Sequence, residues 1–270
     1  VESGDGIALY LRNDIAYFEA AFGAGMLGIY PVPVNWHYTP DEANYLLTDS
    51  GVKLLLIHAD LYDPIKQAIP ADLKVIIVET PPEIREAYSI SETPQPEGLP
   101  RWHELVNAAA PFSGDGEMAP STIIYTSGTT GRPKGVRRAA FTPEQAEAVN
   151  TMLGWSYGYS EVLAGKRDPA TITTAVIGPV YHSAPNAHSS FSIRVGANVV
   201  ICPRFDAEAL LALIEKERIT HLNMVPIMFN RLLRLPEEVK RKYDLSSLEY
   251  VTHAAAPCPP PVKRAMIEWW

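Results

Sequence analysis

The 270-residue sequence lacks the features that mark several classes of protein. No apolar run approaches the roughly 18 residues that a membrane-spanning helix needs, so no transmembrane segment is expected. There are only two cysteines, Cys202 and Cys258, which is too few for a disulfide framework or a cysteine zinc cluster. Low cysteine usage is typical of a reducing compartment, and we therefore expect a cytoplasmic protein.

An excess of basic residues is also missing. The chain has 23 Lys and Arg against 31 Asp and Glu, a formal net charge of −8. Binding to a nucleic-acid backbone needs a basic face, so nucleic acid is not an expected partner. There is no repeat of fixed period and no low-complexity tract. A hydrophobic content of 47% is ordinary for a globular protein, and a chain of this length can bury a substantial core.

What the chain does contain is an alternation of strand-like and helix-like segments. Strand patterns occur at 6–11, 29–34, 53–58, 74–79, 171–177, 198–202, 221–225 and 248–253. Helical patterns occur at 14–27, 61–69, 102–109, 143–163, 187–195 and 227–235, after Asp206, and between a capping box of Thr39 and Glu42 and Gly51. This alternation predicts an α/β fold with mostly parallel sheets flanked by helices. Residues 80–100 hold five prolines and are expected to be an extended surface segment.

Residues 121–136 read Ser-Thr-Ile-Ile-Tyr-Thr-Ser-Gly-Thr-Thr-Gly-Arg-Pro-Lys-Gly-Val. The β-branched and aromatic residues at 122–126 predict a buried strand. The five small residues at 127–131 can turn backbone N–H groups and hydroxyls toward one point, which makes an anion-binding nest. Lys134 then adds a mobile positive charge suited to a phosphate oxygen. The stretch therefore predicts a site for the phosphates of a nucleotide.

The spacing of this stretch separates it from other phosphate loops. A Walker A loop needs four residues between its glycines and then Gly-Lys-Ser/Thr. Here two residues separate Gly128 and Gly131, and Gly135 follows Lys134. The pattern also differs from a dinucleotide-binding GxGxxG turn. A flexible surface turn is the simpler alternative, but the preceding strand and the following lysine favour a phosphate site.

Residues 126–135 resemble the signature loop of the adenylate-forming superfamily, which contains acyl-CoA synthetases, peptide-synthetase adenylation domains and firefly luciferase. Four further stretches fit this family in the right order: Tyr-Pro-Val-Pro-Val-Asn at 30–35, Gly-Pro-Val-Tyr-His-Ser at 178–183, Val-Pro at 225–226 and His-Ala-Ala-Ala-Pro at 253–257. The resemblance covers nearly the whole chain and is greatest to bacterial fatty-acid or bile-acid acid–CoA ligases. It implies the large N-terminal domain of such an enzyme, with two sub-lobes at 1–110 and 111–270.

The resemblance also implies a reaction. A carboxylate and ATP would give an acyl-adenylate and pyrophosphate, and coenzyme A would then take the acyl group as a thioester. The implied cofactors are ATP and Mg²⁺, with a carboxylic acid and coenzyme A as the other partners; a homodimer is left open. The residues implied to bind the ATP phosphates are Thr126, Ser127, Gly128, Thr129, Thr130, Gly131 and Lys134, with Thr129 as the metal ligand.

Two more turns are assigned by the resemblance. Tyr181 and His182 would line the acyl pocket, whereas His188 is expected to be structural. The residues that would lie against the adenine are His253, Ala254, Ala255 and Ala256. The family usually has glycine at the position of Ala254, a departure that would be strained if φ there were positive. Because ligands of open α/β sheets bind beyond the carboxyl ends of the strands, we expect all three turns to converge on one cleft.

Several parts of the family pattern would lie beyond residue 270: the acidic Thr-x-Glu motif, the ribose-binding aspartate, the hinge and the mobile C-terminal domain with the catalytic lysine. No residue of this chain is therefore assigned as catalytic. We expect the chain to be a fragment, incomplete at both ends, that binds nucleotide weakly and catalyses little or nothing.

The sequence leaves three other interpretations open. Residues 154–158 match the G-x-S-x-G pattern of serine hydrolases, with Ser156 as the nucleophile. That motif requires a strand immediately before the serine, and the preceding residues have a helical pattern instead. A second alternative is a non-catalytic scaffold descended from adenylate-forming enzymes. A third is an amino-acid or aryl-acid adenylation domain that does not use coenzyme A.

Overall fold

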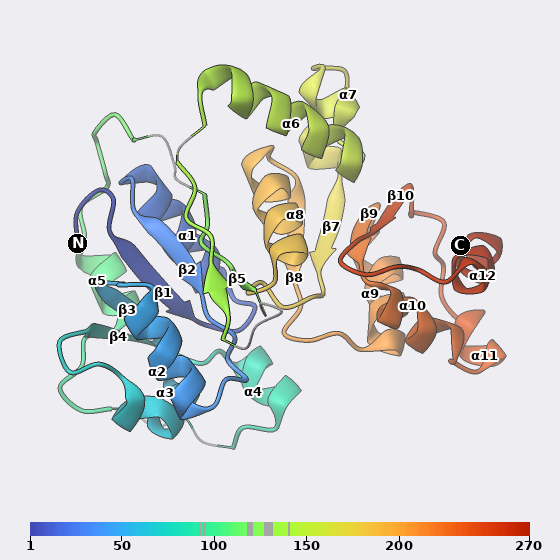
Figure 1. Ribbon diagram of the computed structural model, residues 1–270. Helices are drawn as coiled ribbons and strands as arrows, with labels where there is room; N and C mark the ends of the chain where they lie inside the picture. Colours follow the sequence, from blue (N-terminus) through green and yellow to red (C-terminus); the bar gives the residue numbers. More distant parts are fainter. Residues whose placement is uncertain (92, 94–95, 118–120, 127–131, 140) are drawn as a thin grey trace. The chain divides into compact units, whose positions relative to one another are not determined.

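The computed structural model describes residues 1–91, 93, 96–117, 121–126, 132–139 and 141–270. The chain divides into two compact units, a first unit of Val1–Phe141 and a second unit of Thr142–Trp270 (Figure 1). This boundary lies later than the one that the sequence analysis placed at residue 110. Ile123 shows the reason, because it is buried in the core of the first unit and its N–H donates to the carbonyl of Pro31 at 2.9 Å.

The first unit contains a four-stranded parallel sheet in the order β2-β1-β3-β4. Its strands are β1 (Gly6–Tyr10), β2 (Tyr30–Pro33), β3 (Leu54–His58) and β4 (Lys74–Val78). Its helices are α1 (Ile15–Met26), α2 (Pro40–Asp49), α3 (Ala59–Ile65), α4 (Pro82–Tyr88) and α5 (Trp102–Ala108), with a short 3₁₀ turn at Lys66–Ala68. The expected parallel α/β architecture is confirmed.

Local sequence signals explain where these helices begin. Thr39 and Glu42 form the capping box expected before α2, with Pro40 in the first helical turn. Asp14 caps α1 by accepting a hydrogen bond from the N–H of Ile15. Each cap satisfies backbone donors that the helix itself leaves without partners.

The prediction of an extended segment at 80–100 was wrong for its first part, where α4 forms. A long-range contact of Tyr88 stabilises this helix. The guanidinium of Arg12 lies 4.6 Å from the centre of the Tyr88 ring and 4.9 Å from that of the Trp36 ring. Arg12 also forms a buried ion pair of 2.7 Å with Asp60. The ring contact and the buried ion pair hold α4 beside the carboxyl ends of β1 and β3, a tertiary effect that proline counting does not reveal.

The second unit has its own four-stranded parallel sheet, in the order β10-β9-β7-β8. Its strands are β7 (Thr173–Val176), β8 (Asn198–Ile201), β9 (His221–Met224) and β10 (Tyr250–His253). Its helices are α6 (Pro143–Tyr157), α7 (Ser160–Leu163), α8 (Ser183–Arg194), α9 (Ala207–Glu217), α10 (Pro226–Leu233), α11 (Glu237–Lys240) and α12 (Pro260–Trp269), with a 3₁₀ turn at Pro169–Thr171.

The single helix predicted at 143–163 is in fact two. Gly158 has φ of 82°, a left-handed conformation that ends α6 and suits glycine. A Cβ there would lie 2.6 Å from the ring of Tyr250, so the glycine also permits close packing. In the part of the chain that the structure describes, no helix has the length and apolar character needed to cross a membrane.

Candidate active site

The described part of the predicted phosphate loop is its base. Strands β5 (Tyr125–Thr126) and β6 (Lys134–Gly135) form a two-residue antiparallel pair in which Thr126 faces Lys134. Both of these residues are exposed. The strand predicted at 122–126 is shorter than expected, because only Tyr125 and Thr126 belong to β5. Ile123 is buried as predicted. Five predicted phosphate-binding residues lie outside the described residues: Ser127, Gly128, Thr129, Thr130 and Gly131.

The base of this loop is held by α2. The hydroxyl of Tyr125 donates a hydrogen bond of 2.8 Å to Asp49, and the hydroxyl of Tyr45 donates one of 3.0 Å to the carbonyl of Pro133. The guanidinium of Arg132 lies 4.8 Å from the centre of the Tyr45 ring. Burial, and secondly the bond to Asp49, raise the pKa of Tyr125 above its usual value. Tyr125 therefore remains a hydrogen-bond donor at neutral pH.

Gly135 is required by this arrangement. A Cβ at this position would lie 2.5 Å from Cε2 of Tyr125 and 3.0 Å from Cγ2 of Ile123. In the sequence, Gly135 is evident only as the residue after Lys134. Tyr45, Asp49 and Tyr125 could not be recognised there as anchors, since nothing in their spacing shows that they meet.

Lys134 differs from its basic neighbours. Arg137 lies 4.3 Å from the ring of Tyr30 and donates to the carbonyl of Gly4 at 2.5 Å, and Arg132 is occupied by Tyr45. Lys134, by contrast, forms no ion pair or hydrogen bond through its side chain with any residue that the structure describes. A free, exposed ammonium at the base of a hydroxyl-rich loop is suited to neutralising phosphate charge.

The two other predicted turns both belong to the second unit and lie at the same edge of its sheet. One follows β7 and contains Tyr181 and His182, whose ring centroids are 4.5 Å apart. The other follows β10, which pairs parallel to β9, itself parallel to β7. Because the strands are parallel, their carboxyl ends meet at one edge, where ligands of such sheets bind.

The turn after β7 is fixed by local contacts. Asn186 donates to the carbonyl of Val180 at 2.9 Å, and Gly178 lies so close to Pro185 that a Cβ would come within 2.7 Å of its Cγ. His182 is the residue that precedes α8 and makes no capping hydrogen bond. Part of its surface is exposed to solvent, and the burial of the rest lowers the pKa of His182 below the usual value.

The turn after β10 contains a strained residue. Ala255 has φ of 68°, whereas Ala254 is not among the described non-glycine residues with positive φ. The strain considered for Ala254 therefore falls one position later. His253 packs edge-on against Phe229, with ring centroids 5.9 Å apart, and its Nδ1 is buried without a hydrogen-bond partner among the described residues.

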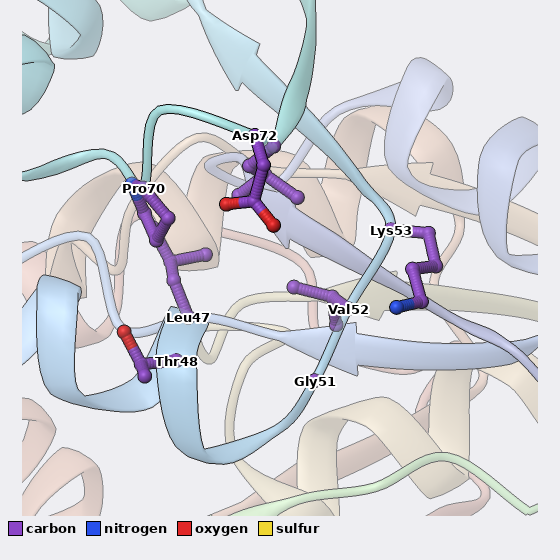
Figure 2. A pocket seen from close by; sticks show the side chains of 8 residues that line it. Leu47, Thr48, Gly51, Val52, Lys53, Pro70 and Asp72 are labelled. Carbon is purple, nitrogen blue, oxygen red and sulfur yellow. The ribbon is translucent and has the colours of Figure 1, made fainter.

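Convergence of all three turns on one cleft remains a prediction, because the phosphate loop belongs to the first unit and the other two turns to the second. The pocket in Figure 2, of about 160 Å³, lies elsewhere. Lys53 and Asp72, two of the residues that line it, come just before β3 and β4. It therefore sits at the amino-terminal edge of the first sheet, and none of the predicted site residues lines it.

The structure contradicts the serine hydrolase alternative. Ser156 lies inside α6, near its C-terminal end, and not after a strand. A nucleophile elbow needs a sharp strand-to-helix turn, so this serine cannot take that role.

The described residues also contain no group of three or more His, Cys, Asp and Glu side chains that could hold a metal ion. Thr129, the predicted magnesium ligand, is outside those residues. A Mg²⁺ ion bound mainly by substrate phosphates and water needs few protein ligands, which is compatible with this finding.

Comparison with known proteins gives concordant matches. The family described as AMP-binding enzyme matches residues 1–270. The 4-hydroxybutyrate–CoA ligase 2 of Metallosphaera sedula is 28% identical over 269 residues, covering 96% of this chain and 45% of its own. The 4-coumarate–CoA ligase 3 of Arabidopsis thaliana is 30% identical over 260 residues, covering 95% and 43%. This chain thus spans less than half the length of these curated relatives.

Solved structures show the same fold. The inhibitor-bound N-terminal domain of FACL13 from Mycobacterium tuberculosis aligns with a TM-score of 0.69 and 25% identity, covering 99% of this chain and 61% of that one. The ATP-bound RpMatB-BxBclM chimera B3 aligns with a TM-score of 0.76 and 21% identity, covering 100% and 48%.

Proposed function

Because this chain belongs to the AMP-binding enzyme family, we propose that it is the nucleotide- and acyl-binding part of an ATP-dependent acid–CoA ligase. The enzyme joins a carboxylate to ATP, releases pyrophosphate, and passes the acyl group to coenzyme A. The curated relatives are named as CoA ligases, which supports this class of reaction. Their names specify different acids as substrates. A fatty acid or a related carboxylate in the cytoplasm is the substrate that we propose.

The observation that carries the proposal is the pairing of Thr126 with Lys134 at the base of the loop. This pairing brings a hydroxyl and a free ammonium group to the two ends of one short, hydroxyl-rich segment. Substitution at a phosphate depends chiefly on positioning and on neutralising negative charge. We assign Lys134 and the hydroxyls and amides of 126–131 to the phosphates of ATP, with Thr129 as the protein ligand of a bridging Mg²⁺.

The other assignments follow the second sheet. Tyr181 and His182 are proposed to flank the acyl group, and the turn from His253 to Ala256 to lie against the adenine. Each of the curated relatives named above is more than twice as long as the part that matches this chain. We therefore propose that further residues of the complete enzyme supply the catalytic groups, and that residues 1–270 alone bind nucleotide weakly.

The test is Lys134→Ala in the full-length protein, with acid-dependent ATP–pyrophosphate exchange as the measurement. We expect a loss of about 10- to 100-fold, the range in which removal of a charged phosphate contact falls. Lys53→Ala is the matched control, because Lys53 is also an exposed lysine of the first unit but lines a pocket that contains none of the predicted site residues. Unchanged exchange in Lys134→Ala would favour the scaffold interpretation.

Coenzyme A distinguishes the ligase from an adenylation domain that does not use it. A ligase releases AMP faster when coenzyme A is present and forms an acyl thioester. AMP release that is indifferent to coenzyme A, with no thioester formed, would support an amino-acid or aryl-acid adenylation domain instead.

A further inference from the structure

The two faces of the second sheet differ in chemistry. On β9, Leu222 and Met224 point to an apolar cluster that includes residues of α9 and α10. Strand alternation places His221 and Asn223 on the opposite face, which α8 covers. In Figure 1, α8 runs beside β7 and β8 of the same unit. Buried polar residues therefore gather between α8 and the sheet.

Most of these buried polar groups are satisfied. Ser189 is fully buried and donates to the carbonyl of Pro185 at 2.7 Å. Ser192 donates to the carbonyl of His188 at 2.8 Å and accepts from the hydroxyl of Tyr159 at 2.8 Å. Thr174 donates to the carbonyl of His221 at 2.7 Å. Such pairing is the rule for polar groups inside proteins.

Two groups break this rule. His188 is 2% exposed and Asn223 is 8% exposed. Nε2 of His188 and Nδ2 of Asn223 have no hydrogen-bond partner among the residues that the structure describes. Leaving a buried polar group without a partner is destabilising, because the group has lost its hydrogen bonds to water. Both groups, one on α8 and one on β9, are therefore able to form a further hydrogen bond.

Their position connects them to the proposed acyl site. Helix α8 begins directly after Tyr181 and His182, and its residues Ala184 and His188 are four positions apart, so they share one face. Asn223 is the next-to-last residue of β9, and it lies near the edge of the sheet where that turn is found. An acyl group that entered at the turn and ran between α8 and the sheet would pass the small Ala184 and reach both groups.

We propose that His188 and Asn223 bind a hydroxyl or carbonyl oxygen on the acyl part of the substrate, away from the carboxylate that reacts. This inference rests on the proposed function and narrows its substrate class, among fatty acids and related carboxylates, to acids that carry a further oxygen on the acyl part. It gives His188, expected to be structural from the sequence, a role in specificity.

The charge state of His188 limits the kind of oxygen. Burial, and secondly the neighbouring His221, lower the pKa of His188 to about 3. Its ring is therefore neutral at physiological pH and presents one donor and one acceptor. Asn223 is neutral as well. A neutral pair suits a hydroxyl or carbonyl group, whereas a second carboxylate would need a positive charge in this buried position.

The experiment uses the full-length protein and matched pairs of acids: butyrate with 4-hydroxybutyrate, cinnamate with 4-coumarate, and decanoate with its hydroxy and oxo derivatives. The measurement is kcat/KM in acid-dependent ATP–pyrophosphate exchange. We expect at least one oxygenated acid to exceed its oxygen-free partner by about 10-fold or more, since an enzyme site with unpaired buried polar groups rejects the analogue that leaves them unpaired.

The variants His188→Leu and Asn223→Leu are each expected to reduce this preference about 10-fold, because each removes one of the two groups that would bind the additional oxygen. Ser189→Ala is the matched control. It removes a buried hydroxyl from the next position of α8, but that hydroxyl is satisfied within the helix, so the preference should not change. The two variants lie on different elements, so misfolding of one need not affect the other. The comparison of acids with the unmodified enzyme tests the inference even if neither variant folds.

Equal or better use of every oxygen-free acid by the unmodified enzyme would overturn the inference and leave the ligase proposal intact; this is the result expected if a buried water satisfies both groups. A preference that persists in both leucine variants would also overturn it. Exchange with no acid of any kind would overturn the proposed function, and this inference with it.

Discussion

Thr126 and Lys134 are paired across the two-residue ladder of β5 and β6. The two ends of the phosphate loop therefore lie side by side. The hydrogen bonds of Tyr125 to Asp49 and of Tyr45 to Pro133 attach these ends to α2. A loop that binds phosphates through many weak donors needs such a fixed base, because each donor contributes only if it is already aimed at the ligand. The first two predictions concern this base.

Gly135→Ala is expected to destabilise the first unit and weaken ATP binding, because the added Cβ would collide with the Tyr125 ring. Overpacking of this kind costs about 1–3 kcal/mol. Chemical unfolding and the KM for ATP are the measurements. Gly23→Ala is the control, since nothing lies within 4 Å of its added Cβ and alanine favours the surrounding helix. Equal behaviour of the two variants would contradict the packing argument.

Tyr125→Phe is expected to raise the KM for ATP several-fold and to lower the free energy of unfolding by about 1 kcal/mol, the usual contribution of one hydrogen bond. The ring and its packing are retained, so the loss is confined to the interactions of the hydroxyl with Asp49 and Ser50. Tyr62→Phe serves as the control, because no hydrogen bond of its hydroxyl is found among the described residues. A KM unchanged from that of the native enzyme would show that this anchor does not position the loop.

Ala255→Gly is expected to raise the free energy of unfolding by about 0.5 kcal/mol. Relief of the left-handed strain at Ala255 is worth about 1 kcal/mol, and the greater freedom of glycine in the unfolded chain offsets part of it. Ala254→Gly brings only the unfavourable part, because φ there is not positive. Thermal or chemical unfolding should therefore separate these neighbouring variants by about 1 kcal/mol; a reversed order would contradict the prediction.

Stability should fall as the pH is lowered through the range in which unfolded His188 takes up a proton. Its pKa is about 3 in the folded protein, against 6.5 for an exposed histidine. Below pH 6.5 the unfolded chain binds more protons at this site than the folded chain, so acid favours unfolding. Between pH 7 and pH 5 this residue alone should account for a loss of about 2 kcal/mol.

The measurement for this prediction is urea unfolding at the two pH values. His188→Leu should remove the contribution of His188, whereas Ser189→Ala should keep it. His221 also has a lowered pKa, so the difference between the native protein and His188→Leu, and not the total pH dependence, carries the prediction. An identical pH dependence of the two proteins would refute it.

Much of the secondary structure was predictable because its signals are local. The capping box of Thr39 and Glu42 depends on residues within one helical turn, and the strands of both sheets have continuous apolar patterns that depend on neither sheet order nor partners. The helix α4 was missed because Tyr88 is held by Arg12, which is distant in the sequence. The break at Gly158 was missed because a lone glycine can also sit inside a helix.

The candidate site was predictable only where a motif carried it. The loop of 126–135, the turn at Tyr181 and His182 and the turn at His253 are all short contiguous strings, and the structure places the last two at one edge of the second sheet. Tyr45 and Asp49 as anchors of the loop, and Asn223 as an unpaired donor facing α8, had no such string to reveal them.

The sequence by itself therefore determined the family, the α/β class and the order of the elements, because each of these depends on local backbone preferences and on motifs of a few neighbouring residues. Tertiary structure alone decided which side chains hold the loop, which residue takes the left-handed strain, and which buried groups are left without partners. These properties depend on contacts between residues far apart in the chain, and only packing brings such residues together.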